Sequence, residues 1–206
     1  MADTGFILTG TGADGGGGTS WSNPTNIQAE ANNAAVSGFV AGTPVQTSYL
    51  RATNFDFSGS LSSGDTIDGI EVQVSCASAN TFFNYEWSNA QLRTSSGRTG
   101  ADKSPSNPET MPTSQTTVTM GGASDTWSTS YDADDILGSD FGIDIQFHSD
   151  PGPPFPYGFL VWWVKIKIHY TASASGYAND VFGVASANIG KVFGVETANI
   201  DKVFGS

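Results

Sequence analysis

The sequence predicts an all-β protein, namely an antiparallel β-sandwich of the jelly-roll kind followed by a C-terminal repeat tail. Segments of alternating apolar and polar residues recur along residues 1–172, separated by turns rich in Gly, Pro, Ser and Asn. No convincing long amphipathic helix interrupts them. About seven to nine strands at this spacing are typical of a sandwich, and among sandwiches we favour a jelly roll. Residues 173–206 differ in kind, because they repeat with a period of 11 residues.

The strongest strand signal covers residues 159–170, FLVWWVKIKIHY, which alternate over their whole length. We expect the even-numbered residues to face the core: Leu160, Trp162, Val164, Ile166, Ile168 and Tyr170. On the other face Lys165, Lys167 and His169 are expected in solvent. Phe159, Val161 and Trp163 would share that outer face, where a loop of the same chain or a neighbouring subunit must cover them. We predict a subunit contact.

The other elements follow in chain order. We expect strands at 6–8, 49–58, 67–76, 82–94, 115–120 and 141–148, a short helix or irregular crossing at 27–35, and one helical turn at 133–137. In the second strand Tyr49, Arg51, Thr53, Phe55 and Phe57 share one predicted face. A bulge or short turn is expected near Ser88 and Asn89, because the apolar parity changes there. In the strand at 141–148, Phe141, Ile143, Ile145 and Phe147 should point inward, with Asp144, Gln146 and His148 outward.

The composition argues against several classes of protein. The net charge is −12, and a chain this acidic lacks the basic surface that nucleic-acid binding requires. No segment is apolar for the roughly 18 residues of a membrane span, and the N-terminus does not resemble a signal peptide. The abundance of Gly, Ser, Thr and Asn suits an extracellular or particle-surface β-protein. The single Cys76 cannot form an internal disulfide, and we interpret it as a small buried hydrophobe.

Candidate reactive groups are few, and we predict no catalytic residue, metal or cofactor. The acidic run Asp132, Asp134, Asp135 and Asp140 lacks the glycine turn and ligand order of an EF-hand, so we interpret it as a solvated loop, with calcium as the alternative. His148 and His169 have no ligand partner at zinc spacing. Glu71, Glu86 and Asp144 could supply the acid pair of a glycosidase, but the sequence gives no way to pair them. The chain is not expected to be an enzyme.

Aromatic residues leave one alternative open. Tyr85, Trp87 and Tyr157 could stack on the sugar rings of a glycan, although we favour core or interface packing for the aromatic side chains of the strands.

The C-terminal tail reads VFGVASANIGK, VFGVETANIDK and VFGS. We expect short helical turns begun by Ser186 and Thr197, alternating with extended Val-Phe-Gly-Val segments. Two such repeats bury little alone, so we predict that they dock, either on neighbouring copies or on a partner, with a disordered linker as the alternative. The expected contacts are the apolar repeat residues: Val181, Phe182, Ile189, Val192, Phe193, Val195, Ile200, Val203 and Phe204.

The segments YLRATNFDFSGSLSSGDTIDGIEVQV, GGASDTWSTSYDADDILGSDFGIDIQF and VWWVKIKIHYT together resemble a jelly-roll module found in structural proteins of tailed bacteriophages. The resemblance runs from about Trp21 to Thr171. The ANIGKVFGV repeats are similar to repeats of phage virion proteins, with Phe182, Phe193 and Phe204 where a polar Asn is usual. That departure favours a docked tail.

This resemblance implies a role in particle architecture and brings no catalytic residues. We expect a virion structural protein, first of all a capsid decoration or cement protein that is a homotrimer, is assembled in the host cytoplasm and contacts the major capsid protein or another virion protein. The alternative is a receptor-binding or carbohydrate-binding module of a tail fibre or tail tip. No nucleic-acid or membrane partner is expected.

Overall fold

The computed structural model describes residues 1–38, 45–78, 85–105, 111–149 and 158–173, together with 191–192 and 195–196. The chain divides into two compact units, Met1–Thr171 and Ala172–Ser206. The elements of the first unit are β1 (Ala2–Asp3), β2 (Ile7–Leu8), β3 (Thr11–Asp14), β4 (Trp21–Ser22), the 3₁₀ helix η1 (Pro24–Gln28), β5 (Ala35–Gly38), β6 (Val45–Gln46), β7 (Leu50–Thr53), β8 (Thr66–Ser78), β9 (Tyr85–Thr94), β10 (Gly97–Arg98), β11 (Thr116–Gly121), α1 (Ala133–Leu137), β12 (Gly142–Ser149) and β13 (Gly158–Thr171). The second unit contains β14 (Lys191–Val192) and β15 (Val195–Glu196).

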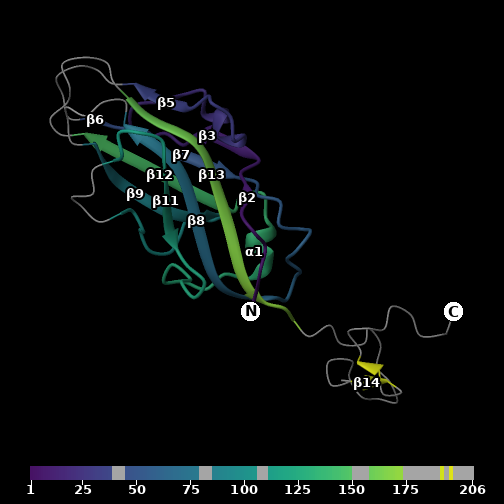
Figure 1. Ribbon diagram of the computed structural model, residues 1–206. Coiled ribbons are helices and arrows are strands. Elements are labelled where there is room, and N and C mark those ends of the chain that lie inside the picture. Colours follow the sequence, from purple (N-terminus) through teal and green to yellow (C-terminus); the bar gives the residue numbers. More distant parts are fainter. Residues whose placement is uncertain are drawn as a thin grey trace. The chain divides into compact units, whose positions relative to one another are not determined.

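Two antiparallel sheets make up the first unit and pack face to face (Figure 1). Sheet A has the strand order β11-β8-β13-β5-β4, and β1 and β2 pair with β13 further along its length. Sheet B has the order β10-β9-β12-β7-β3, with β6 also paired to β12. The predicted all-β sandwich is confirmed, since alternating strands can bury their apolar sides only by facing a second sheet.

The strand order identifies the sandwich as a jelly roll. From β7 to β9 and again from β11 to β13, each strand lies in the sheet opposite to the one before it. The pairs β5–β13, β7–β12, β8–β11 and β9–β10 are all antiparallel. This is the pairing expected when a long antiparallel ribbon is rolled into two sheets, so the jelly roll predicted from the sequence is confirmed.

Aromatic contacts join the two sheets at one end of the core. Phe159 of β13 stacks on Phe147 of β12 with ring centroids 5.0 Å apart, and it meets the ring of Tyr85 edge to face at 5.3 Å. Trp87 of β9 lies 4.6 Å from the same Phe147 ring. All four side chains are at most 6% exposed. Each such pair adds about 0.5–1.5 kcal/mol beyond the burial of its area, so this end of the core is strongly held.

A β-bulge in β13 decides which side chains face the core. Val161 lies opposite Cys76 of β8, whereas Trp163 lies opposite the adjacent Ser75, so Trp162 is the extra residue. An extra residue reverses the side on which every preceding side chain lies. The alternation predicted for residues 159–170 therefore holds only after the bulge.

The two faces predicted for the first part of β13 are wrong for this reason. Phe159 and Val161 are fully buried, whereas Leu160 and Trp162 are partly exposed. Beyond the bulge the prediction is confirmed: Val164, Ile166, Ile168 and Tyr170 are buried.

The strand predicted at 49–58 is shorter than expected. β7 ends at Thr53, because Asn54 has φ of 59° and breaks the extended backbone. Within β7, Leu50 and Ala52 are fully buried and Arg51 points to the other side. The single face predicted for Tyr49, Arg51, Thr53, Phe55 and Phe57 is therefore interrupted at Asn54. Phe55 and Phe57 do reach the core, from the segment after the strand.

Sheet B confirms two further predictions. Gln146 of β12 pairs with Asn89 and Phe147 pairs with Trp87, so Ser88 is bulged out of β9 near the expected position. The inward residues of β12 are buried as predicted: Phe141 just before the strand, then Ile143, Ile145 and Phe147.

Both short helices lie outside the sheets. α1 spans the predicted residues, and its first turn is closed by a capping box in which the Asp132 and Asp135 side chains accept from backbone amides. The crossing predicted at 27–35 contains a 3₁₀ helix that begins earlier, at Pro24, and ends at Gln28. The predicted range also extends too far, since Ala35 already belongs to β5. Among the described residues, no helix is long and apolar enough to cross a membrane.

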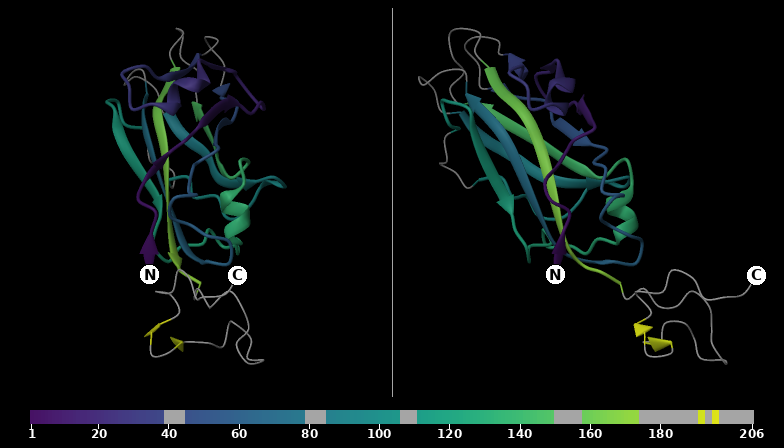
Figure 2. Two further views of the ribbon diagram at one scale, coloured as in Figure 1. Left: turned by 90° about the vertical axis from the view of Figure 1, so that its right-hand side faces the viewer. Right: turned by 45° about the vertical axis from the view of Figure 1, so that its right-hand side comes forward.

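The two ends of the sandwich are built from different parts of the chain. At one end β1 pairs with the last residues of β13, so the N-terminus lies beside Thr171, where the chain leaves the sandwich. α1 lies toward this end (Figure 2). At the other end the termini of β5, β8, β9, β12 and β13 meet, as the pairs Gly158↔Gly38, Phe159↔Ser78 and Ser149↔Tyr85 record.

In the second unit, β14 and β15 pair antiparallel, with Lys191 opposite Glu196 and Val192 opposite Val195. The backbone on both sides of Phe193 and Gly194 is therefore extended, in line with the prediction for the Val-Phe-Gly-Val segment. The predicted helical turns lie outside the described residues.

Candidate functional site

The outer face of sheet A carries two adjacent tryptophans at the bulge of β13. Trp162 and Trp163 are both partly exposed, and the Lys165 ammonium lies 4.8 Å from the centre of the Trp163 ring. Of the three residues predicted for a subunit contact, Trp163 alone keeps exposed surface. Phe159 and Val161 are buried inside their own chain, so the prediction that they face outward is wrong.

Each lysine of this face has a carboxylate partner. Lys165 Nζ lies 2.6 Å from Glu30, and Lys167 Nζ lies 2.9 Å from Glu71, which also lies 3.4 Å from His169 Nε2. His169 was expected in solvent, yet it is only 9% exposed. The cations of sheet A are thus matched nearly one to one by acids.

The remaining predicted chemical groups are dispersed. Cys76 is fully buried, as interpreted from the sequence, and burial raises the pKa of its thiol to about 12. Such a thiol stays protonated and unreactive at neutral pH. His148 pairs with Glu86 at 3.2 Å. Within the described ranges no group of three His, Cys, Asp or Glu side chains is suited to hold a metal ion.

The carboxylates considered for a glycosidase do not share a cleft. Glu71 lies on sheet A, whereas Glu86 and Asp144 lie on sheet B. Glu86 pairs with His148, four residues along β12 from Asp144, which corresponds to about 13 Å. A retaining or inverting pair requires roughly 5–9.5 Å, so these residues are not arranged as one.

The aromatic residues considered for glycan stacking belong to the core where the structure describes them. Tyr85 is 1% exposed and Trp87 is 6% exposed, so the preferred interpretation of core packing is confirmed for both. Tyr157 lies outside the described residues.

A groove of about 490 Å³ runs along β11, the edge strand of sheet A. It is lined by Lys103, Pro105 and Pro112 and by the residues from Thr116 to Gly121. Edge strands present backbone N–H and C=O groups that an added strand can pair with.

A polar cleft of about 590 Å³ lies at the end of the sandwich where the chain leaves it. The loop at Ser63–Ile67 and the segment that leads into α1 form its walls, with Asp65, Asp132 and Asp134 among the lining residues. Of the predicted run of four acids, Asp132 and Asp135 form the capping box of α1, whereas Asp134 and Asp140 are exposed to solvent.

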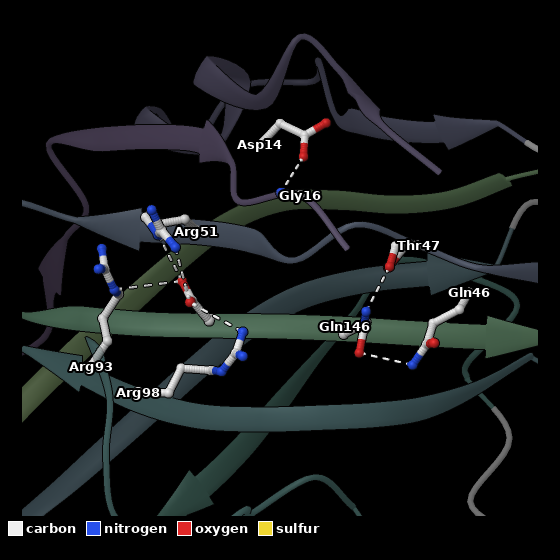
Figure 3. A network of polar contacts seen from close by, with 9 residues as sticks. Asp14, Gly16, Gln46, Thr47, Arg51, Arg93, Arg98 and Gln146 are labelled. Carbon is white, nitrogen blue, oxygen red and sulfur yellow. Dashed lines mark hydrogen bonds and ion pairs between the residues drawn. The ribbon is translucent and has the colours of Figure 1, made fainter. Parts of the chain in front are cut away.

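The most concentrated charge in the described structure lies on the outer face of sheet B. Asp144 of β12 points outward as predicted, yet it is only 1% exposed. Arg51 of β7 forms a fork with it, from Nε to Oδ1 at 3.0 Å and from Nη2 to Oδ2 at 3.3 Å. Arg93 of β9 and Arg98 of β10 approach the same carboxylate to 3.8 and 3.9 Å. Figure 3 shows the three guanidinium groups converging on it. We call these four residues the arginine cluster.

Polar neighbours enclose the arginine cluster. Arg98 lies over the ring of Tyr49, 3.9 Å from its centre. Further along β12, Gln146 is 3% exposed, because its amide donates to Thr47 O at 2.8 Å and accepts from Gln46 at 2.9 Å (Figure 3). Gln146, like Asp144, points outward as predicted, yet neighbouring side chains cover it.

The glycine run at 15–18 forms a turn beside Tyr49. The Asp14 carboxylate accepts from the amides of Gly16 at 2.8 Å and Trp21 at 3.0 Å, which closes the turn. Burial would raise the pKa of Asp14, but these backbone hydrogen bonds outweigh it and lower the pKa. Gly18 cannot be replaced without a shift, because a Cβ there would lie 2.4 Å from Gln46 O.

Sequence reasoning missed the arginine cluster, although a signal for it exists. Arg51, Arg93 and Arg98 are all the arginines of the chain. Arg51 stands between the apolar Leu50 and Ala52, so it occupies the outer face of a strand. The sequence does not reveal that all three share one face.

The apolar repeat residues predicted as anchors lie outside the described residues, except for Val192 and Val195, whose backbones pair in the β14–β15 ladder. Comparison of the chain with models of protein families, with curated proteins and with solved structures found no match.

Proposed function

We propose that this chain is a structural protein of a tailed bacteriophage particle, which coats or stabilises the head as a decoration or cement protein. Residues 172–206 anchor it to the major capsid protein or to neighbouring copies, and the jelly roll is the part that projects. A homotrimer is the assembly that we expect.

The observation that carries the proposal is that the two ends of the sandwich differ. The chain leaves the sandwich at Thr171, beside the N-terminus. The ends of five strands meet at the opposite end, one length of β13 away. With 14 residues in β13, that length is about 45 Å. A protein held through its C-terminal residues therefore presents this distant end outward.

The C-terminal unit supports an anchoring role through its sequence. It forms a compact unit separate from the sandwich, and its repeats place a Val-Phe pair at every eleventh residue. Apolar side chains repeated at regular spacing along a sequence are typical of a segment that is covered by a partner. The groove beside β11 and the partly exposed Trp162 and Trp163 offer further contact surfaces on the sandwich.

The test uses the full-length protein and capsids purified from the phage that encodes it. A variant with Phe182, Phe193 and Phe204 all changed to Ser removes the apolar repeats and leaves the sandwich intact. A control variant changes Asn188 and Asn199 to Ser in the same repeats. Light scattering gives the mass of each protein, and cosedimentation with capsids gives binding.

We expect the wild type and the control to be trimers that bind capsids, and the triple variant to lose binding. A wild type that ignores capsids contradicts the proposal. Binding to a glycan array by the same wild type would then favour the receptor-binding module instead.

A further inference from the structure

The arginine cluster contains more positive than negative charge. Three guanidinium groups surround one carboxylate, and the only acid within ion-pair distance of any of them, among the described residues, is Asp144. Three positive charges and one negative charge leave a local charge of +2, on a chain whose net charge is −12. The excess is confined to one patch on the outer face of sheet B.

Two of the three arginines lack hydrogen-bond acceptors within the described part of the chain. Asp144 accepts hydrogen bonds from Arg51, whereas Arg93 and Arg98 stay 3.8 Å and 3.9 Å away, beyond hydrogen-bond distance. The Arg93 side chain is only 11% exposed, and its buried Nε has no acceptor. A guanidinium carries five N–H donors, and leaving such a donor buried without an acceptor is costly.

The strand register places the two underused arginines side by side. Arg98 of β10 is the direct cross-strand partner of Arg93 of β9. Like charges directly opposite each other destabilise a sheet, unless an anion lies between them. Arg98 is further held in place by the Tyr49 ring beneath it. The pair is therefore fixed in position, and the one carboxylate it shares with Arg51 compensates only part of its positive charge.

We propose that Arg93 and Arg98, with Arg51 and Asp144 beside them, form a surface binding site for an oxyanion. The side chains of Arg51 and Arg98 are 32% and 40% exposed, so the site is open to solvent and accepts a single charged group, either a free ion or one carried by a larger molecule. Phosphate, sulfate and carboxylate share the required chemistry, since their oxygens accept paired N–H groups from guanidinium. This site goes beyond the proposed function, and neither proposal depends on the other.

The experiment observes the arginine side chains directly. Because the chain has three arginines, the Nε–H region of a ¹⁵N NMR spectrum contains three side-chain signals, which single Arg→Gln variants assign. The full-length protein is titrated with sodium phosphate, sodium sulfate and sodium acetate, with sodium chloride at equal ionic strength as the reference. A short peptide with a free C-terminal carboxylate, and the same peptide as its amide, test a carboxylate carried by a polypeptide.

We expect saturable shifts of the Arg93 and Arg98 signals, with a Kd on the order of a millimolar for the best small anion. Preference for the peptide acid over its amide and over acetate would identify the source as a polypeptide, whereas preference for phosphate or sulfate would identify a free or esterified anion. In Arg98→Gln the affinity falls about tenfold, as expected for the loss of charge-assisted hydrogen bonds.

Lys165→Gln is the matched control. It also removes one positive charge from a strand, but on sheet A, and it should leave the anion affinity unchanged. Arg98 is exposed enough that its replacement should not unfold the protein, which a thermal melt checks. The proposal is overturned if the Arg93 and Arg98 signals respond no differently to oxyanions than to chloride, or if Arg98→Gln and Lys165→Gln bind equally well.

Discussion

The two outer faces of the sandwich both carry charged residues, yet they balance charge differently. On sheet A, Lys165 meets Glu30 at 2.6 Å and Lys167 meets Glu71 at 2.9 Å, so each of these two lysines has a different acid as its partner. On sheet B all three arginines depend on Asp144, which is 1% exposed. Matched pairs spread the stabilisation over many weak contacts, whereas a shared acid concentrates it in one residue.

This difference has a physical consequence for each face. Partly exposed ion pairs are worth about 0–1 kcal/mol each, since water solvates both partners and salt screens them. Removing one member of a buried pair leaves an uncompensated charge with little solvent, which costs far more than the pair contributes. Removing one charge from the outer face of sheet A should therefore cost little stability. Removing the shared acid from the outer face of sheet B should cost much more.

The largest expected effect comes from the shared acid. Asp144→Asn should lower the free energy of unfolding by about 3 kcal/mol, because three arginines then face each other without an acid. Glu71→Gln is the matched change on sheet A and should cost about 1 kcal/mol or less. Urea unfolding followed by tryptophan fluorescence measures both. Equal losses in the two variants would mean that the two faces do not differ as described.

A smaller effect on stability, and one that depends on pH, is expected at the ion pair between Asp125 and Lys103. Burial would raise the pKa of Asp125, but hydrogen bonds from Lys103 and from the Trp127 amide, with the Lys103 charge, outweigh it and lower the pKa. A lowered carboxyl pKa stabilises the fold above the ordinary value of 3.8, and this stabilisation is lost as the pH falls through the folded-state value.

Asp125→Asn should therefore reduce stability by about 1 kcal/mol at pH 7. The difference from the wild type should shrink as the pH falls from about 5 to 2. Urea unfolding across that range is the measurement. A difference that stays constant with pH would show that the carboxylate charge is not its source.

A loss of at most about 0.5 kcal/mol is expected for Lys165→Gln, because its partner Glu30 is 57% exposed and stays hydrated when left alone. The same unfolding measurement applies. A loss several times larger would indicate that the Trp163 ring beneath the ammonium contributes more than the ion pair does.

The smallest effect, and the one with an unusual sign, is expected at Arg98. Arg98→Gln removes one of two cations that lie directly opposite each other, so at low salt the stability should stay equal or rise by up to about 0.5 kcal/mol. Unfolding at low and high salt tests this, since screening should erase the gain. A clear loss of stability at low salt would show that Arg98 mainly compensates Asp144.

Much of the fold could be predicted because alternation is a local property. The segments that became β8, β12 and the second half of β13 carry a buried apolar residue at every second position, and an apolar side of that length requires a second sheet. The helical turn at Ala133 could be predicted for the same reason, since Asp132 and Asp135 close its first turn from within the segment.

The errors arose where one extra residue or one unusual dihedral angle interrupts the alternation. Trp162 is bulged out of β13, so Phe159 and Val161 turn to the core and lose the outward position predicted for them. Asn54 at φ of 59° ends β7 and separates Arg51 from Phe55. Neither interruption is strongly marked in the neighbouring residues. A bulge, for example, depends on how a strand pairs with its partner, which lies far away in the sequence.

The sequence by itself determined the class of the fold, the strands that form the core and the repeat character of the C-terminal residues, because periodicity and composition act over neighbouring positions. Only the tertiary structure decided where charge gathers. Arg51, Arg93 and Arg98 come from three strands and meet at Asp144 on a fourth, and the jelly-roll pairing alone brings these strands together in register. Long-range strand pairing sets such a meeting, and no local pattern of residues encodes it.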